Sequence, residues 1–185
     1  MRSSFTFVAA PLLVVAYGLI RLLDGLDGER GPGLAWTTGH LAFLVALFLF
    51  LPLLWELRRR AGEGRFATVT AAVAVVGIVC SLVQISVDLV VGALAADHDD
   101  MRHRFTGFHN LPGVDLVVYE AGPVLFYLGL VVLVWRLVAA HAVPTWRAVA
   151  VTLAVCVAPM NLDLLPVVGL LLLVGLAPFP RRLAP

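Results

Sequence analysis

The sequence predicts an all-α integral membrane protein, a compact bundle of about six transmembrane helices forming a single domain over residues 1–185. Three observations support this prediction. The chain is 61% hydrophobic and only 14% charged, its mean hydropathy is +0.99, and long apolar runs recur along it. Soluble domains usually carry about 25% charged residues. We therefore expect a multi-pass protein of the plasma membrane, with the lipid bilayer as its first partner.

The apolar runs cover residues 5–23, 34–57, 66–96, 114–139 and 145–177. Each run is long enough to cross a hydrocarbon core of about 30 Å, which takes about 20 helical residues. The first run is expected to be a retained helix and not a cleaved secretory signal. No A-x-A-like cleavage site follows its apolar centre, and the charged residues Arg21 and Asp24 end it.

The fifth run is too long for one straight span, and its middle carries helix-breaking residues. The segment APMNLDLLP, residues 158–166, contains two prolines together with Asn161 and Asp163. These residue types favour turns and helix starts. The run is therefore predicted to form two short helices, which gives six spans. The alternative is one broken span, which gives five.

The arginines predict the orientation of the bundle, because arginine is enriched in cytoplasmic loops. In the six-span layout nine arginines lie on the side of the N-terminus and four lie opposite, so both termini are predicted to be cytoplasmic. With five spans the counts become seven and six. The nine are Arg2, Arg58, Arg59, Arg60, Arg65, Arg136, Arg147, Arg181 and Arg182, and the four are Arg21, Arg30, Arg102 and Arg104.

The charged residues also exclude several classes of function. The formal net charge is +1 and the basic residues lie at the ends of apolar runs, so no nucleic-acid partner is expected. The chain contains no lysine, which excludes Schiff-base chemistry. Cys80 and Cys156 both fall within apolar runs, where cysteine usually acts as a small buried apolar residue, so they do not suggest a redox pair.

Polar residues inside the predicted spans gather at one level of the bundle, near the outer side. The inner half of every span is almost purely apolar, so scattered polar positions would not be expected to sort in this way. An ionisable group in a span usually faces the bundle interior or a water-filled cavity. The residues at this level are Arg21, Asp24, His40, Gln84, Asp88, Glu120, Asn161 and Asp163.

These residues predict an outward-opening pocket for general acid-base chemistry. The candidate catalytic residues are Glu120, Asp163, His40 and Asp88. Pro123 is expected to kink the helix beside Glu120 and to free the carbonyl of Tyr119, because proline lacks an N–H donor. The candidate substrate-binding residues are Gln84, Asn161, Tyr119, Tyr127, Arg21 and Asp24.

Each of these residues also has a structural interpretation. Asp163 fits the N-cap of the last helix, with Pro166 in its first turn. Asp88 fits an interfacial carboxylate paired with Arg21 or Arg102. Gln84 fits a hydrogen bond between helices, and His40 fits a packing histidine as well as a proton relay or metal ligand. The four tryptophans, Trp36, Trp55, Trp135 and Trp146, lie near helix ends and fit interface anchors.

The third loop, DHDDMRHRF followed by FHN, contains weak candidate metal ligands, namely His98, Asp99, His103 and His109. It lacks the spacing of a known zinc motif. Asp100 and Arg104, four residues apart, suggest instead a solvated turn with a salt bridge. We therefore predict no cofactor and no assigned metal site, and a divalent metal in this loop is the alternative.

Three classes of function fit the sequence. The first is a small membrane enzyme acting by acid-base chemistry on a hydrophobic small molecule, either lipid-like or an isoprenoid. Its layout is similar to that of integral-membrane terpene cyclases, although no residue corresponds. The second is a proton- or cation-coupled carrier, which at this length would need to form a homo-oligomer. The third is a non-catalytic partner or sensor subunit.

Overall fold

The computed structural model describes residues 2–26, 28–62 and 64–178, and within these ranges it contains helices and no strand. Most of the chain lies in seven α-helices and two short helical segments of other types. The elements are α1 (Arg2–Asp24), α2 (Leu34–Arg60), α3 (Arg65–Leu94), α4 (His98–His109), the π-helix η1 (Asp115–Ala121), α5 (Gly122–Ala139), α6 (Thr145–Val157), the 3-10 turn η2 (Leu162–Leu164) and α7 (Leu165–Leu176).

Four of the helical segments are long and apolar enough to cross a membrane, as predicted for the first four runs. They cover Phe5–Asp24, Leu34–Arg60, Arg65–Leu94 and Asp115–Ala139. Thr145–Val157 and Leu162–Leu176 are apolar but shorter. The fifth run therefore breaks in the predicted place, between Val157 and Leu165. These helices indicate a membrane protein.

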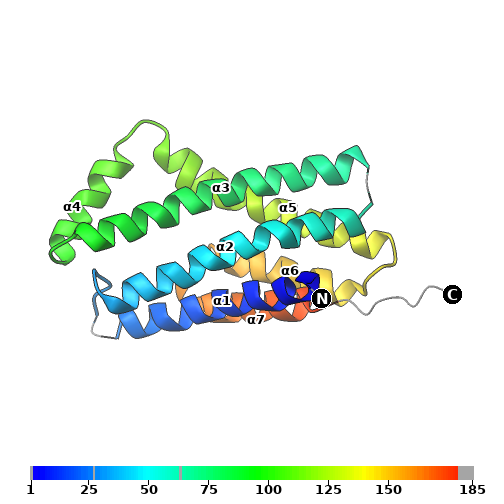
Figure 1. The fold of residues 1–185 in the computed structure, drawn as a ribbon, viewed down its shortest axis with the longest axis horizontal. Helices are drawn as coiled ribbons and strands as arrows, with labels where there is room; N and C mark the ends of the chain where they lie inside the picture. Colours follow the sequence, from blue (N-terminus) through cyan, green and yellow to red (C-terminus); the bar gives the residue numbers. More distant parts are fainter. Residues whose placement is uncertain (1, 27, 63, 179–185) are drawn as a thin grey trace.

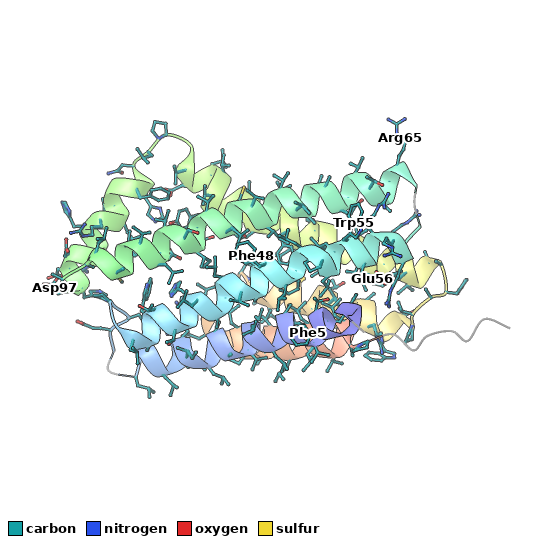
Figure 2. All side chains as sticks on the ribbon, in the orientation of Figure 1. Phe5, Phe48, Trp55, Glu56, Arg65 and Asp97 are labelled. Atoms are coloured by element: carbon teal, nitrogen blue, oxygen red, sulfur yellow. The ribbon has the colours of Figure 1, made fainter. Side chains whose placement is uncertain are left out.

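The long elements run back and forth along one axis, so the loops collect at two ends (Figure 1). The α4 end contains residues 28–33 and the helix α4, and the turn between α6 and α7 lies on the same side but short of that end. The arginine end contains residues 58–61 and 140–144, and both the start of α1 and the end of α7 lie there. Figure 2 shows the two ends by their labelled side chains, with Asp97 at the α4 end and Arg65 at the arginine end.

The outward surface of the long helices is apolar, which fits a lipid environment. Phe48 of α2 is 53% exposed, Val69 of α3 is 60% exposed and Leu170 of α7 is 51% exposed (Figure 2). Cys156 of α6 is exposed as well, contrary to the expectation that both cysteines are buried, because it lies on the outward face of a short peripheral helix. Cys80 is half-buried.

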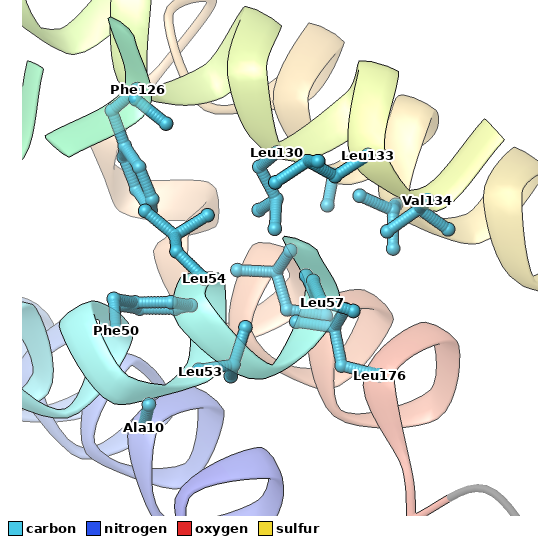
Figure 3. Close-up of a cluster of buried hydrophobic side chains, with 14 of the residues drawn as sticks. Ala10, Phe50, Leu53, Leu54, Leu57, Phe126, Leu130, Leu133, Val134 and Leu176 are labelled. Atoms are coloured by element: carbon cyan, nitrogen blue, oxygen red, sulfur yellow. The ribbon is translucent and has the colours of Figure 1, made fainter. Parts of the chain in front are cut away.

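The core of the arginine half is a closely packed cluster of leucines (Figure 3). Leu53, Leu54 and Leu57 of α2 face Leu130 and Leu133 of α5, and all five are 0% exposed. Their spacing of three and four residues places them on one side of each helix. This packing leaves no polar side chain among them.

Glycine lets α3 and α5 cross at very short range. A Cβ atom on Gly77 would lie 2.3 Å from the backbone nitrogen of Phe126 and 2.5 Å from the carbonyl oxygen of Gly122. Small residues at such crossings allow backbones to approach within a membrane. The crossing fixes α3 against the start of α5, so residues 84–88 of α3 lie beside η1.

The start of the fourth span is a π-helix, where the sequence predicted a proline kink. Gly122 donates its N–H to the carbonyl of Val117, five residues earlier, and Pro123 stands in the first turn of α5. Proline cannot donate a helical hydrogen bond, and a π-helical turn is one way to accommodate that loss. Such turns are frequent at functional sites. Here the turn carries Tyr119 and Glu120.

The helix α4 corrects a sequence prediction, because this segment was expected to be a turn. Asp97 caps the helix by accepting a hydrogen bond from the backbone N–H of Asp100 at 2.9 Å. Asp99 and Asp100 lie in the first turn, where carboxylates stabilise the positive end of the helix dipole. The expected pair of Asp100 and Arg104 is present at 3.0 Å, one helical turn apart.

Candidate functional site

A cavity of about 670 Å³ lies toward the α4 end and is lined by α1, α2, α3, α5 to α7 and both short helical segments. Seven of the ten predicted catalytic and substrate-binding residues line it. They are Arg21, His40, Gln84, Asp88, Tyr119, Glu120 and Tyr127. Polar residues that were predicted to lie at one level, and that come from segments far apart in the sequence, therefore surround one cavity.

The buried polar pair of the cavity is His40 and Asp88. His40 is 4% exposed and Asp88 is 8% exposed, and the Nε2 atom of His40 lies 3.7 Å from a carboxylate oxygen of Asp88. The structure thus pairs Asp88 with neither Arg21 nor Arg102, the two partners that the sequence suggested. Arg21 approaches Asp163 and Arg102 approaches Asp99 instead.

The hydrogen bonding of His40 defines its protonation. Its Nδ1 atom lies 2.8 Å from the carbonyl oxygen of Trp36, and a carbonyl can only accept, so Nδ1 carries a proton. Nε2 therefore faces Asp88 either as a lone pair or as a second N–H. A bare lone pair beside a bare carboxylate is repulsive, so the pair favours one shared labile proton. At 3.7 Å the two atoms are too far apart for a direct hydrogen bond, so the proton rests on one of them and can be exchanged with a polar ligand atom in the cavity.

Two aromatic residues that the sequence did not assign to the site hold His40 in place. Trp36, one helical turn earlier on α2, stacks on the imidazole with 4.0 Å between ring centroids. Tyr17 of α1 meets the imidazole edge-on at 5.3 Å. Trp36 also donates its indole N–H to the backbone carbonyl of Asp88 at 3.1 Å, so it connects both members of the pair. The spacing of four residues between Trp36 and His40 is the signal that could have revealed this contact.

The entrance of the cavity lies between the start of α5 and the turn that joins α6 to α7. The most exposed lining residues are Glu120, Val124 and Leu128 on one side, and Pro159 and Leu162 on the other. Val124 is 51% exposed, Leu128 is 54% exposed and Leu162 is 49% exposed. The entrance is therefore on the flank of the bundle and its rim is mainly apolar.

Glu120 stands on this rim and is exposed, in contrast to the buried position that its sequence context suggested. Among the described residues no hydrogen bond or ion pair to its carboxylate is found. Tyr119, its neighbour on the π-helix, has a buried hydroxyl without a hydrogen-bond partner in the described part of the chain. Both groups are available to a ligand.

Asp163 and Asn161 do not line the cavity. Asp163 accepts a hydrogen bond from Arg30 at 2.7 Å and lies 3.5 Å from Arg21, so it ties the first loop and α1 to the turn before α7. Asp163 is not the N-cap of the last helix, because Leu164 holds that position in α7; Asn161 caps the preceding turn η2 by accepting from the backbone N–H of Asp163 at 2.8 Å. Asp24 lies beside a small neighbouring cleft with Arg21 and His40.

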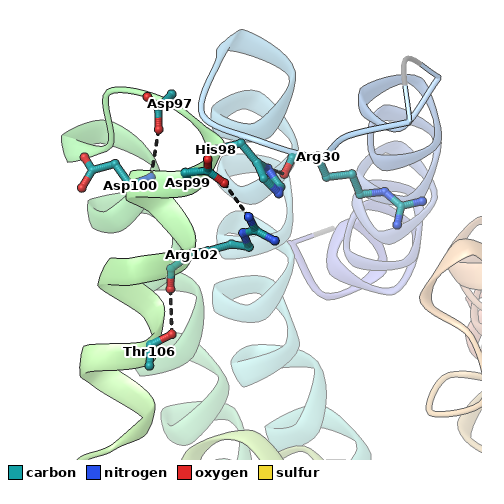
Figure 4. Close-up of polar contacts among 7 residues, drawn as sticks. All are labelled: Arg30, Asp97, His98, Asp99, Asp100, Arg102 and Thr106. Carbon is teal, nitrogen blue, oxygen red and sulfur yellow. Dashed lines mark hydrogen bonds and ion pairs between the residues drawn. The ribbon is translucent and has the colours of Figure 1, made fainter.

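Three of the four weak metal candidates around α4, all but His103, make separate contacts, and Figure 4 shows those of His98 and Asp99. His98 bonds the backbone carbonyl of Arg30 at 2.9 Å, Asp99 pairs with Arg102, and His109 pairs with Asp115. Within residues 2–26, 28–62 and 64–178, no three His, Cys, Asp or Glu side chains are placed to hold a metal ion.

Asp100, also on α4, lies outside the membrane-spanning segments and has a perturbed acidity. The backbone N–H of Ala96 and the guanidinium of Arg104 both donate to its carboxylate and lower the pKa of Asp100 below its ordinary value. Its role is to stabilise the start of α4.

Comparison with known proteins gives no match to a family model, to a curated protein or to a solved structure. The function is therefore argued from the site itself. In chemical terms, the site combines a buried histidine and carboxylate, an unpartnered rim carboxylate and an apolar lateral entrance.

Proposed function

We propose that the chain crosses the plasma membrane six times with both termini in the cytoplasm, which puts the α4 end outside. The distribution of arginines supports this orientation. The short helices α6 and α7 support the count, because the turn between them reaches Arg21 near the α4 end of α1. At 13 residues α6 extends about 20 Å, so its ends are expected to draw the bilayer thinner locally.

We propose further that the protein is an enzyme that performs acid-base chemistry on an amphipathic substrate, lipid-like or isoprenoid, taken from the membrane. The observation that carries this proposal is the His40 and Asp88 pair, buried in a cavity whose entrance opens through the flank of the bundle. A water-soluble substrate would not need an apolar rim of Val124, Leu128 and Leu162. A lipid-like molecule can enter by that route with its tail still in lipid.

In the proposed reaction the pair delivers or removes one proton. Nε2 of His40 or the carboxylate of Asp88 holds the labile proton and exchanges it with a substrate atom that approaches the pair from the cavity. The contacts of Trp36 and Tyr17 keep the imidazole in one orientation, which lowers the entropy cost of proton transfer. Gln84 and Tyr119 supply hydrogen bonds to the polar end of the substrate. The proposed reaction uses side chains alone and involves no cofactor.

The packing favours an enzyme over the carrier alternative. A carrier needs a route from its site to the opposite side of the membrane. Between the cavity and the arginine end lies the leucine cluster, in which Leu53, Leu54, Leu130 and Leu133 are 0% exposed (Figure 3). A partner or sensor role would not explain why His40 and Asp88 are buried together.

The test is allele replacement in the cell that carries this protein, followed by mass spectrometry of its membrane lipids without preselection of targets. We expect His40→Gln and Asp88→Asn to reproduce the deletion, with one lipid species accumulating and a related species disappearing. Asp99→Asn, which removes an exposed carboxylate from α4, is the matched control and should resemble the wild type. Immunoblots verify equal amounts of each variant in the membrane.

Three results would oppose the proposal. Wild-type lipid profiles in both His40→Gln and Asp88→Asn would remove the acid-base role. A reciprocal change that appears in the deletion but in neither variant would leave a binding or partner role instead. A proton flux in liposomes reconstituted with the pure protein would favour the carrier.

A further inference from the structure

The lining of the cavity holds two carboxylates, those of Asp88 and Glu120, that no arginine pairs with in the described part of the protein. Glu120 has no hydrogen bond or ion pair there, and the carboxylate of Asp88 has only the imidazole of His40, at 3.7 Å. Among the described lining residues one guanidinium is present, that of Arg21, whose Nε atom lies 3.5 Å from a carboxylate oxygen of Asp163 without a hydrogen bond. The cavity therefore offers the carboxylates of Asp88 and Glu120 to a positively charged ligand.

Aromatic side chains line the same cavity. They are Tyr17, Trp36, Phe43, Tyr119 and Tyr127, contributed by four different elements. The faces of aromatic rings attract cations, and desolvated sites strengthen the attraction. Aromatic rings beside carboxylates are the surroundings in which an organic ammonium is held in preference to a neutral or anionic group.

We propose that the ligand of this cavity is an amphipathic organic cation, with an ammonium-type head held between Asp88 and Glu120 among the aromatic rings. The inference rests on the proposed function and names the class of its substrate. The apolar part of the ligand lies along Val124 and Leu128 and reaches the membrane through the lateral entrance.

The charges of the lining argue against the other head groups. An anionic head would meet the carboxylates of Asp88 and Glu120, and it would share the guanidinium of Arg21 with Asp163. A neutral head can donate a hydrogen bond to Asp88, but it would leave the charge of Glu120 without an opposite charge. A cationic head removes both difficulties.

The experiment compares two probes of nearly equal size and shape but opposite charge, tetraphenylphosphonium and tetraphenylborate. Binding to the full chain is measured by equilibrium dialysis in uncharged dodecyl maltoside micelles, with protein-free micelles as the blank. We expect the cation to bind about tenfold or more tightly than the anion, since the charge of the lining favours one and opposes the other.

Three variants locate the effect. Glu120→Gln lies on the exposed rim and should weaken binding of tetraphenylphosphonium about tenfold without affecting folding. Asp99→Asn removes one negative charge far from the cavity and should leave binding unchanged. Gln84→Trp fills part of the cavity and should abolish binding of the cation.

The outcomes separate this inference from the proposed function. Equal binding of the two probes, both lost in Gln84→Trp, would overturn the cationic class while leaving the pocket in place. Binding of neither probe would also overturn it. In both cases the lipid profiles of His40→Gln and Asp88→Asn still decide the proposed function, because they do not depend on the charge of the ligand.

Discussion

The two halves of the bundle are packed differently, one around a closed apolar core and the other around a polar cavity. In the arginine half, Leu53 and Leu57 of α2 pack against Leu130 and Leu133 of α5 with no exposed surface. In the α4 half the same helices diverge around a cavity of about 670 Å³ that contains a buried histidine and carboxylate. The π-helix η1 marks the boundary on the fourth span. The comparison teaches that the closely packed apolar core and the polar cavity lie in different halves along the long axis of the bundle.

The largest effect should follow from weakening the packed half. Leu130→Ala, at a position that is 0% exposed, should destabilise the fold by about 2 to 3 kcal/mol. This loss is at the low end of the range usual for a buried leucine, because a leucine that leaves the core of a membrane protein meets lipid tails and not water. The measurement is equilibrium unfolding in mixed micelles of increasing sodium dodecyl sulfate content.

Leu128→Ala is the matched control, two residues away on α5 but 54% exposed at the entrance. It should change the free energy of unfolding by less than about 0.5 kcal/mol. Equal losses at the two positions would break the distinction between the packed half and the cavity half.

The crossing of α3 and α5 should be the next most sensitive feature. Gly77→Ala places a Cβ atom within 2.3 Å of the backbone of α5, and we expect a loss of about 1 to 3 kcal/mol in the same unfolding measurement. Gly107→Ala on α4, where a Cβ meets nothing within 4 Å, serves as the control. A harmless Gly77→Ala would show that the two helices are not in close contact.

Arg30 and Asp163 connect the first loop to the turn before α7, and their coupling should be smaller. A double-mutant cycle of Arg30→Gln and Asp163→Asn should give a coupling of about 0.5 to 1 kcal/mol, since both groups are about one-third exposed. Because Asp163 lies outside the cavity, Asp163→Asn should leave the lipid profile of the cell unchanged. Loss of that profile would return Asp163 to the catalytic residues.

The smallest effect concerns pH and the start of α4. The pKa of Asp100 is lowered in the folded protein, chiefly by the N–H of Ala96 and then by Arg104. Its stabilising contribution is therefore present above the ordinary aspartate pKa of about 3.9 and is lost as the pH falls below that value. Amide hydrogen exchange in α4 should become faster over this range in the wild type. In Asp100→Asn the acceleration should be absent, and its persistence would assign the effect to another group.

Much of the fold could be predicted from the sequence because hydrocarbon permits few arrangements. Runs of about 20 apolar residues must form helices there, and the prolines and Asp163 of residues 158–166 mark the break in the last run. The helix α4 was missed because its composition is polar. Its start depends on the cap by Asp97 and on charge pairs, which are weak signals beside hydropathy.

The sequence predicted the depth of the site residues along the bundle, but it did not predict which of them face each other. Depth along a helix follows from residue spacing, so His40, Asp88 and Glu120 were expected to lie at a common level. Which of them face each other depends on helix rotation and crossing, as set by contacts such as Gly77 against Gly122. For this reason Asp88 is buried and Glu120 lies on the exposed rim, whereas the sequence suggested a deep Glu120 and a shallow Asp88.

The most direct test of the account is to identify what occupies the lateral entrance in native membranes. A photoreactive benzoylphenylalanine is placed at Leu128 on the rim, or at Val69, which is 60% exposed on α3 in the arginine half. After irradiation the attached molecules are identified by mass spectrometry. The account predicts bulk phospholipid at position 69 and an additional, distinct amphipathic molecule at position 128, which is lost in Gln84→Trp. Identical sets of bulk lipids at the two positions would contradict it.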